Sequence, residues 1–220
     1  MSLLNTILDI VFPINCISCG KNGTELCVDC LSNSPPAERE SAKWIFPLFD
    51  YRNPLVKKSI WLLKYKGKKR LGIVFAEVMH GAILEELSEL SVMENFRNPI
   101  LIPIPLAQKR QRERGFNQAE FICKYLIEID KKNNSGGNFK LEKDILVKPK
   151  DTEHQARIED RQKRLKNIVG SFFVKNPEKI KGRNIIIIDD VSTTGATLNE
   201  ARKILKQAGA KKIVAFTVAH

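Results

Sequence analysis

The residues best suited to chemistry follow a run of four isoleucines, Ile185 to Ile188. Asp189 and Asp190 stand where this buried strand is expected to end, and ligands bind at the carboxyl ends of parallel strands. A small, hydroxyl-rich run then opens a helix; it comprises Val191, Ser192, Thr193, Thr194, Gly195, Ala196 and Thr197. Backbone N–H groups and hydroxyls at a helix N-terminus suit a phosphate, whereas the two carboxylates suit ribose hydroxyls or Mg²⁺. A sugar phosphate meets both demands, and the alternative is a capped helix beside a solvated acidic turn.

A second candidate anion site follows another short apolar strand, Ile100 to Ile104. This strand ends in prolines, and a basic loop with one glycine then opens a helix expected over Gly115 to Asp130. We expect the loop to face a second anion through Arg114, Gly115, Phe116 and Asn117. The alternative is a basic turn exposed to solvent.

Four of the five cysteines form two C-x-x-C pairs, Cys16 with Cys19 and Cys27 with Cys30. Each pair can bring two thiolates onto one ion, and two pairs complete a tetrahedral zinc site. A site with four protein ligands has no open position for catalysis, so the zinc would be structural. Two redox dithiols or an iron–sulfur cluster are the alternatives. The fifth cysteine, Cys123, lies on an apolar helix face and is expected in the core.

The net charge of +12, from 37 basic and 25 acidic residues, favours an anionic partner. Between Arg52 and Arg70 the chain has eight basic residues and no acid, and Tyr51, Trp61 and Tyr65 lie among or beside them. Phosphate contacts combined with base stacking suit single-stranded DNA. The candidate DNA-binding residues are Lys57, Lys58, Lys64, Lys66, Lys68, Lys69 and Arg70. The alternative places both Trp61 and Tyr65 in the core and leaves the lysines to solvent.

The last third of the chain predicts the fold class. A strand over Ile185 to Ile188, a helix over Thr197 to Ala208 and a strand over Lys212 to Val218 form a βαβ unit. Such a unit predicts an α/β fold, a parallel sheet with helices on both faces. The other expected elements are strands over Trp44 to Tyr51, Leu141 to Val147 and Gly170 to Val174, and helices over Pro54 to Tyr65 and Leu71 to Leu90.

The chain is expected to divide into a small module and one larger domain. Residues 1–34 would hold an amphipathic helix, Met1 to Phe12, and the cysteine module; residues 35–42 would be a linker and residues 43–220 the α/β domain. No apolar run reaches the ~18 residues that a membrane helix needs. No basic residue precedes Lys21, so no secretory signal is expected.

The strand, the acid pair and the Thr-Thr-Gly loop resemble the motif with which type I phosphoribosyltransferases bind phosphoribosyl pyrophosphate (PRPP). The resemblance implies that Asp189 and Asp190 hold the ribose hydroxyls and that Thr193 to Thr197 hold the 5′-phosphate. The loop from Arg114 to Asn117 would then hold the pyrophosphate together with Mg²⁺. The motif does not specify the acceptor.

Further motifs resemble the ComF family of competence proteins along nearly the whole chain. They are the four cysteines, Lys64-Tyr-Lys-Gly67, Pro103-Ile-Pro105, Arg114-Gly-Phe-Asn-Gln118, then Thr152, Gln155, Arg164, Asn167 and Phe172, and the loop from Asp189 to Thr197. Two features depart from the family: Lys148 replaces a usual arginine, and the loop from Asn133 to Asn138 is long. Residues Gln155, Arg164 and Asn167 would belong to a lid over the site.

Membership of this family implies natural transformation, with a cytoplasmic role in handling incoming single-stranded DNA beside a ComF-type helicase. Three functions are compatible with these features. In the first, the chain is a DNA-binding competence factor that binds PRPP without turnover. In the second, it is an active phosphoribosyltransferase acting on a nucleobase or another small acceptor. In the third, it is a scaffold that docks through its zinc module.

Overall fold

The computed structural model describes residues 14–38, 42–133, 139–148 and 170–220. The expected N-terminal helix, Met1 to Phe12, lies outside the described residues. So does the expected lid with Gln155, Arg164 and Asn167.

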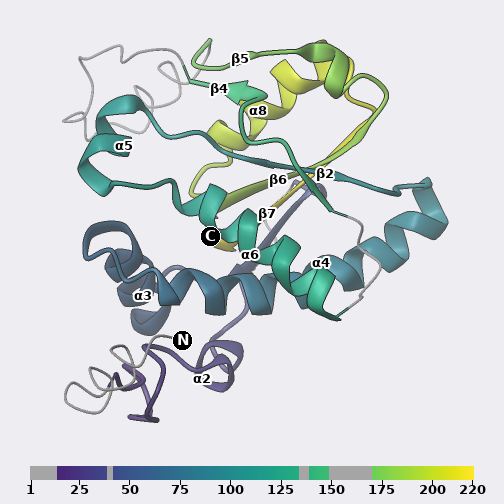
Figure 1. Ribbon diagram of the computed structural model, residues 1–220. Helices are drawn as coiled ribbons and strands as arrows, with labels where there is room; N and C mark the ends of the chain where they lie inside the picture. The colour runs from purple at the N-terminus through teal and green to yellow at the C-terminus, as the bar shows by residue number, and fades with distance from the viewer. Residues whose placement is uncertain (1–13, 39–41, 134–138, 149–169) are drawn as a thin grey trace.

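A five-stranded parallel sheet forms the centre of the molecule (Figure 1), with the order β1-β7-β6-β2-β3. Its strands are β1 (Ile45–Phe49), β2 (Ile100–Pro103), β3 (Lys140–Leu141), β6 (Asn184–Val191) and β7 (Lys212–Ala219). Ile187 lies opposite Ile102 on one side and Ala215 on the other. The isoleucine run is therefore a central strand, and the predicted parallel α/β fold is confirmed.

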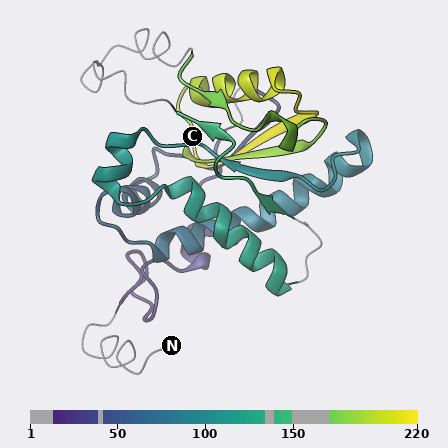
Figure 2. The same cartoon turned by 45° about the horizontal axis from the view of Figure 1, so that its top comes forward.

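Helices cover both faces of this sheet, as Figures 1 and 2 show. Ile186 and Ile188 pack into one core with α3 (Pro54–Tyr65), α4 (Arg70–Glu94) and α6 (Gln118–Asn133). Ile185 and Ile187 pack into a second core with α8 (Ala196–Gln207). Because side chains alternate along a strand, one apolar run supplies both cores. Cys123 is fully buried in the first core, as expected.

Helix α3 shows how local sequence fixes an element beside the site. The side chain of Asn53 accepts hydrogen bonds from the N–H groups of Leu55 and Val56 at 3.0 and 3.2 Å, which satisfies the free donors of the first turn. Pro54 at the first helical position needs no donor there. The predicted helix, Pro54 to Tyr65, is confirmed at both ends.

Three predicted elements differ from the observed ones. The strand expected over Leu141 to Val147 is split: β3 extends the main sheet, whereas β4 (Leu146–Val147) pairs antiparallel with β5 (Phe173–Val174). A turn at Lys143 and Asp144 separates them, and aspartate favours such turns. The basic stretch expected as a loop forms α5 (Gln108–Arg114). Strand β6 also continues past the isoleucines through Val191.

The cysteine module packs directly on the body of the protein. It contains α2 (Val28–Ser32), and its side chains Leu26 and Leu31 are fully buried in the same core as α3 and α4. Pro36 pairs with Phe49 of β1 as an isolated bridge. The core is therefore continuous across the expected linker, and the division at residues 34–43 stays a prediction.

Within the described residues, none of the helices combines the length and the apolar character needed to cross a membrane.

Candidate functional site

The acid pair lies at the carboxyl end of β6, where Asp189 is in register with Thr217 of β7. Asp190 shares the face of Ile188 and points toward the α3 side of the sheet. Its Oδ1 lies 2.7 Å from Nζ of Lys64, and the two side chains are only 11% and 16% exposed. Asp189 uses Oδ1 to accept a hydrogen bond from the N–H of Asp190 at 2.8 Å. The two neighbouring carboxylates thus have different partners.

Burial, and then the charge of Asp190, raise the pKa of Asp189 from 3.8 to about 8. The N–H of Asp190 and the charges of Lys64 and Arg114 act in the opposite direction. This balance shows that Lys64 and Arg114 both exert their charge on the acid pair. The site can therefore gain or lose a proton near neutral pH.

The loop after the acid pair leads into α8. The N–H of Ser192 donates to the carbonyl of Ala219 at 3.0 Å, which ties the loop to the end of β7. Gly195 has a left-handed backbone with φ of +68°, so a glycine is favoured there. The N–H of Ala196, the first residue of α8, donates to Oγ1 of Thr194 at 3.4 Å, and Thr193 and Thr194 are exposed. The other N–H groups of the first turn have no acceptor within the helix. Backbone donors at this helix start are thus available to an anion.

The basic stretch after β2 is anchored by Asn117. Its Nδ2 donates to the carbonyl of Ile104 at 2.9 Å, and its Oδ1 accepts from the N–H groups of Ala119 and Glu120. The amide is the cap of α6, so this helix begins at Gln118 rather than at Gly115. The side chain of Asn117 therefore holds the loop in position, and its predicted role toward a ligand stays a prediction.

Arg114 ends α5 and points toward α3. Its guanidinium lies 5.3 Å from the ring centre of Tyr65, and Nη1 donates to Oε1 of Gln118 at 3.1 Å. Gly115 follows with a left-handed φ of +74°, which turns the chain toward α6. Arg114 therefore lies beside Tyr65, the residue that follows Lys64 in the sequence.

Two aromatic rings of α3 lie on the surface: Trp61 is 47% and Tyr65 is 61% exposed. The alternative that both belong to the core is wrong. Their ring centres are 6.0 Å apart, and Lys66 lies 5.5 Å from the Trp61 ring. Lys69 lies 5.2 Å from the ring of Phe116. We call Trp61, Tyr65, Lys66 and Lys69 the aromatic–basic surface.

The seven basic residues predicted to contact DNA do not share one environment. Lys57, Lys58, Lys66, Lys69 and Arg70 are exposed. Lys68 forms an ion pair of 3.0 Å with Glu25 of the cysteine module, and Lys64 is held by Asp190. The role of Lys64 at the acid pair was missed because the sequence places it in a run of surface lysines. The available signal is helical spacing. Lys64 follows Ile60 by four residues and Leu63 by one, and both are fully buried, so the spacing indicates that the Lys64 side chain is partly buried.

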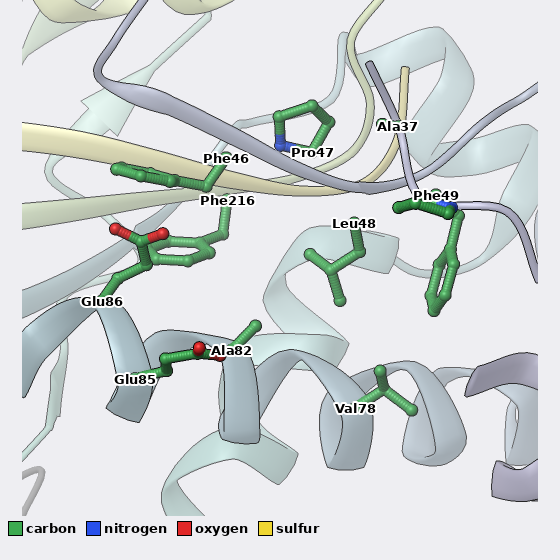
Figure 3. A pocket seen from close by; sticks show the side chains of 11 residues that line it. Ala37, Phe46, Pro47, Leu48, Phe49, Val78, Ala82, Glu85, Glu86 and Phe216 are labelled. Atoms are coloured by element: carbon green, nitrogen blue, oxygen red, sulfur yellow. The ribbon is translucent and has the colours of Figure 1, made fainter. Parts of the chain in front are cut away.

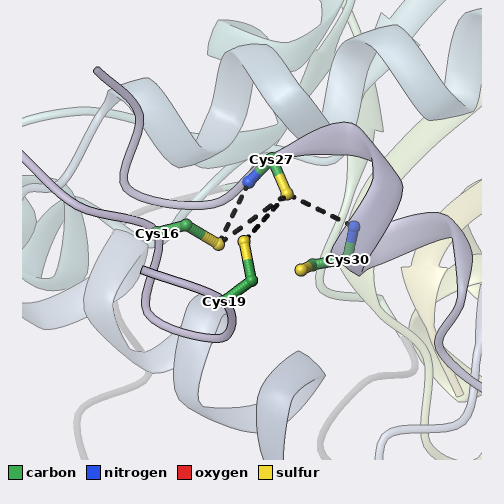
Figure 4. Close-up of side chains that lie close together, drawn as sticks. All are labelled: Cys16, Cys19, Cys27 and Cys30. Atoms are coloured by element: carbon green, nitrogen blue, oxygen red, sulfur yellow. Dashed lines mark hydrogen bonds between the residues drawn. The ribbon is translucent and has the colours of Figure 1, made fainter. Parts of the chain in front are cut away.

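The four predicted zinc ligands converge (Figure 4): the Sγ atoms of Cys16, Cys19, Cys27 and Cys30 all lie within 4.8 Å of one another. Sγ of Cys27 lies 3.8 Å from that of Cys16 and 3.7 Å from that of Cys19. Tetrahedral zinc with Zn–S bonds of about 2.3 Å separates its sulfurs by about 3.8 Å. The N–H groups of Cys27 and Cys30 also point at sulfur atoms. The cluster therefore fits a zinc ion.

The pKa values of the cysteine thiols in the cluster are consistent with a bound cation. Burial raises the pKa of Cys16, but backbone hydrogen bonds from Cys19, Cys27 and Ser18 outweigh it and lower the pKa to about 6. A hydrogen bond with Ser18 lowers the pKa of Cys30, whereas those with Cys27 and Cys19 raise it to about 12. Four thiolates this close cannot all ionise without a cation to hold them.

A separate cavity of about 280 Å³ lies between β1 and α4 (Figure 3). Phenylalanine rings of β1 and β7 and two glutamates of α4 line it. None of the predicted site residues is among its lining residues. This cavity is therefore distinct from the predicted ligand site.

Comparison with known proteins places the chain in a family. It is 31% identical over 207 residues to competence protein ComFC of Streptococcus pneumoniae, covering 93% of this chain and 80% of that protein. This chain belongs to the ComF family of competence proteins. Competence protein F of Haemophilus influenzae is 29% identical, with coverage of 91% and 83%. DNA utilization protein YhgH of Escherichia coli O157:H7 is 26% identical, with coverage of 90% and 80%.

The sequence model described as "Phosphoribosyl transferase domain" matches residues 129–220, which include β6, the Thr-Thr-Gly loop and α8. Together with the parallel sheet, this match identifies a phosphoribosyltransferase fold. Among solved structures, hypoxanthine phosphoribosyl transferase of Trypanosoma cruzi superposes with a TM-score of 0.41 at 13% identity, covering 83% of this chain and 71% of that one. The relatives among ComF proteins support a role in competence.

Proposed function

We propose that this ComF protein binds PRPP through the carboxyl edge of its sheet. The observation that carries the proposal is an acid pair directly before the N-terminus of a helix, with Lys64 paired to Asp190 and the charges of Lys64 and Arg114 acting on Asp189. The carboxylates of Asp189 and Asp190 would hold the ribose hydroxyls. The loop Val191, Ser192, Thr193, Thr194, Gly195, Ala196 and Thr197 would hold the 5′-phosphate.

The pyrophosphate would lie on the α5 side, near Arg114 and the backbone of Gly115 and Phe116. Mg²⁺ prefers oxygen ligands and keeps several waters, so it is usually held by one or two carboxylates together with substrate phosphates. The acid pair offers such oxygens, but one oxygen of Asp190 already accepts from Lys64. Mg²⁺ therefore fits best as an ion that arrives with PRPP.

Phosphoribosyl transfer to a nucleobase or another small acceptor is the second candidate function. Its supporting observation is the pKa of about 8 for Asp189, which suits a group that exchanges a proton near neutral pH. In such a reaction Arg114 would stabilise the charge of the departing pyrophosphate. Fixed positive charge placed where negative charge develops is a large source of rate enhancement.

We further propose that the aromatic–basic surface contacts single-stranded DNA. Exposed rings stack on bases without sequence preference, and neighbouring lysines bind phosphates. The exposed Trp61 and Tyr65 with Lys66 and Lys69 provide both kinds of contact. The family resemblance implies that this occurs in the cytoplasm beside a ComF-type helicase.

Calorimetric titration with PRPP, with and without Mg²⁺, tests the first proposal. Wild type is expected to bind only with Mg²⁺, and the double variant Asp189→Asn, Asp190→Asn is expected to lose binding. Asp144→Asn, in an exposed turn, is the matched control and should bind like wild type. Circular dichroism and zinc content establish that each variant is folded. Normal binding by the double variant would contradict the site assignment.

A further inference from the structure

Lys64 differs from every other lysine of α3 in what surrounds it. Lys57 and Lys58 are exposed, whereas Lys64 lies in the last turn beside the fully buried Leu63. Its side chain is 16% exposed, and Nζ points at Oδ1 of Asp190 from 2.7 Å. This lysine is therefore directed into the sheet edge.

A largely buried ion pair is costly to form, because both charges lose water. Packing gives no reason for a lysine here, since an apolar side chain would fill the space without that cost. The pair lies at the ligand-binding edge of the sheet. Lys64 is paired with Asp190, and the charges of Lys64 and Arg114 also act on Asp189, so this edge of the sheet offers positive charge to an anionic ligand.

The chemistry of PRPP determines which of its groups lies nearest this lysine. The pyrophosphate is bonded to C1 of the ribose, next to the C2 hydroxyl, and the 5′-phosphate is at the other end of the sugar. A carboxylate that holds the ribose hydroxyls therefore lies beside the pyrophosphate. Arg114 lies over Tyr65, the residue after Lys64, so the loop predicted to bind pyrophosphate is on the same side.

We propose that Lys64 binds the pyrophosphate of PRPP and does not contact DNA. This inference rests on the proposed function. An ammonium group has three donors, and the hydrogen bond to Asp190 uses one of them. The other two can reach phosphate oxygens while Asp190 keeps the side chain in position.

The test compares Lys64→Met, Lys64→Arg and the exposed control Lys58→Met against three probes: PRPP with Mg²⁺, ribose 5-phosphate, and a fluorescent oligothymidine. Lys64→Met is expected to weaken PRPP binding by roughly tenfold or more, the size of a charged hydrogen bond. Its affinity for ribose 5-phosphate, which lacks the pyrophosphate, should change by less than about threefold. Its affinity for oligothymidine should match that of wild type. Lys64→Arg keeps the charge and should restore most of the PRPP affinity.

Four outcomes would overturn the proposal. Equal losses for PRPP and ribose 5-phosphate would make Lys64 a structural support of the acid pair. A loss of oligothymidine binding relative to wild type would return it to the DNA surface. PRPP binding by Lys64→Met equal to that of Lys58→Met would exclude Lys64 from the PRPP site. A wild type that binds no PRPP would overturn the proposed function as well. If Lys64→Met does not fold, Lys64→Gln, a neutral donor for Asp190, carries the same comparison.

Discussion

Asp189 and Asp190 are neighbours in sequence with opposite electrostatic surroundings. Because they lie on one strand, their side chains point to opposite faces, and only Asp190 reaches the ammonium of Lys64. Asp189 is left with a backbone N–H as its partner and with the charge of Asp190 next to it. Two carboxylates with different proton affinities can take different roles toward one ligand.

The raised pKa of Asp189 predicts how the stability of the ligand-free protein depends on pH. Its pKa is about 8 in the folded chain and 3.8 ordinarily, so the folded state holds the proton more tightly. This contribution to stability is fully present below about pH 4 and is lost as the pH rises through 8. The melting temperature of wild type should therefore fall, relative to that of Asp189→Asn, between about pH 4 and 8. Parallel melting curves for the two proteins would contradict the assignment, and Asp144→Asn should parallel wild type.

At the scale of elements, the sequence predicts the helices and strands whose apolar side chains face a core. The four isoleucines, the helix over Pro54 to Tyr65 and the final βαβ unit follow from burial and capping alone. The split between β3 and β4 could not be predicted, because the pairing of each two-residue strand is decided by a distant partner. Helix α5 has no buried residue, so its sequence carries no amphipathic signal.

The same reasoning applies to the candidate site. The acid pair, the Thr-Thr-Gly loop and the four cysteines were predictable because their chemistry lies within short stretches of sequence. The pairs Lys64 with Asp190 and Lys68 with Glu25 join residues that are far apart in the chain. Such pairs depend on the packing of whole elements, which no local pattern contains.

The cysteine module predicts the result of removing zinc. Isolated zinc fingers gain about 10–16 kcal/mol of folding free energy from the metal. The loss here should be smaller, since Leu26 and Leu31 also pack against the main core. Cys19→Ser should lose the metal and several kcal/mol of stability, measured by elemental analysis and urea unfolding. The control is Cys123→Ala, which should keep one zinc per chain because Cys123 is buried in the core, away from the cluster. Zinc retained in Cys19→Ser would contradict the assigned ligand set.

At the scale of the whole molecule, the positive charge is spread over several surfaces, but the exposed rings of α3 mark one of them. Lys203 of α8 is also exposed, on the helix that covers the opposite face of the sheet. Net charge alone would let either face attract DNA. On the α3 side, lysines lie beside the exposed rings of Trp61 and Tyr65.

This asymmetry predicts different effects of two kinds of substitution on binding of single-stranded DNA. Lys66→Ala should weaken binding and lower the slope of log K against log salt by ~0.7, the contribution of one phosphate contact to a single strand. Trp61→Ala should cost about 1–3 kcal/mol, the value of one stacked base, and leave that slope unchanged. Lys203→Ala is the matched control and should change neither quantity. Fluorescence anisotropy with oligothymidine at several salt concentrations measures both, and equal effects of Lys66→Ala and Lys203→Ala would show that binding follows net charge rather than this surface.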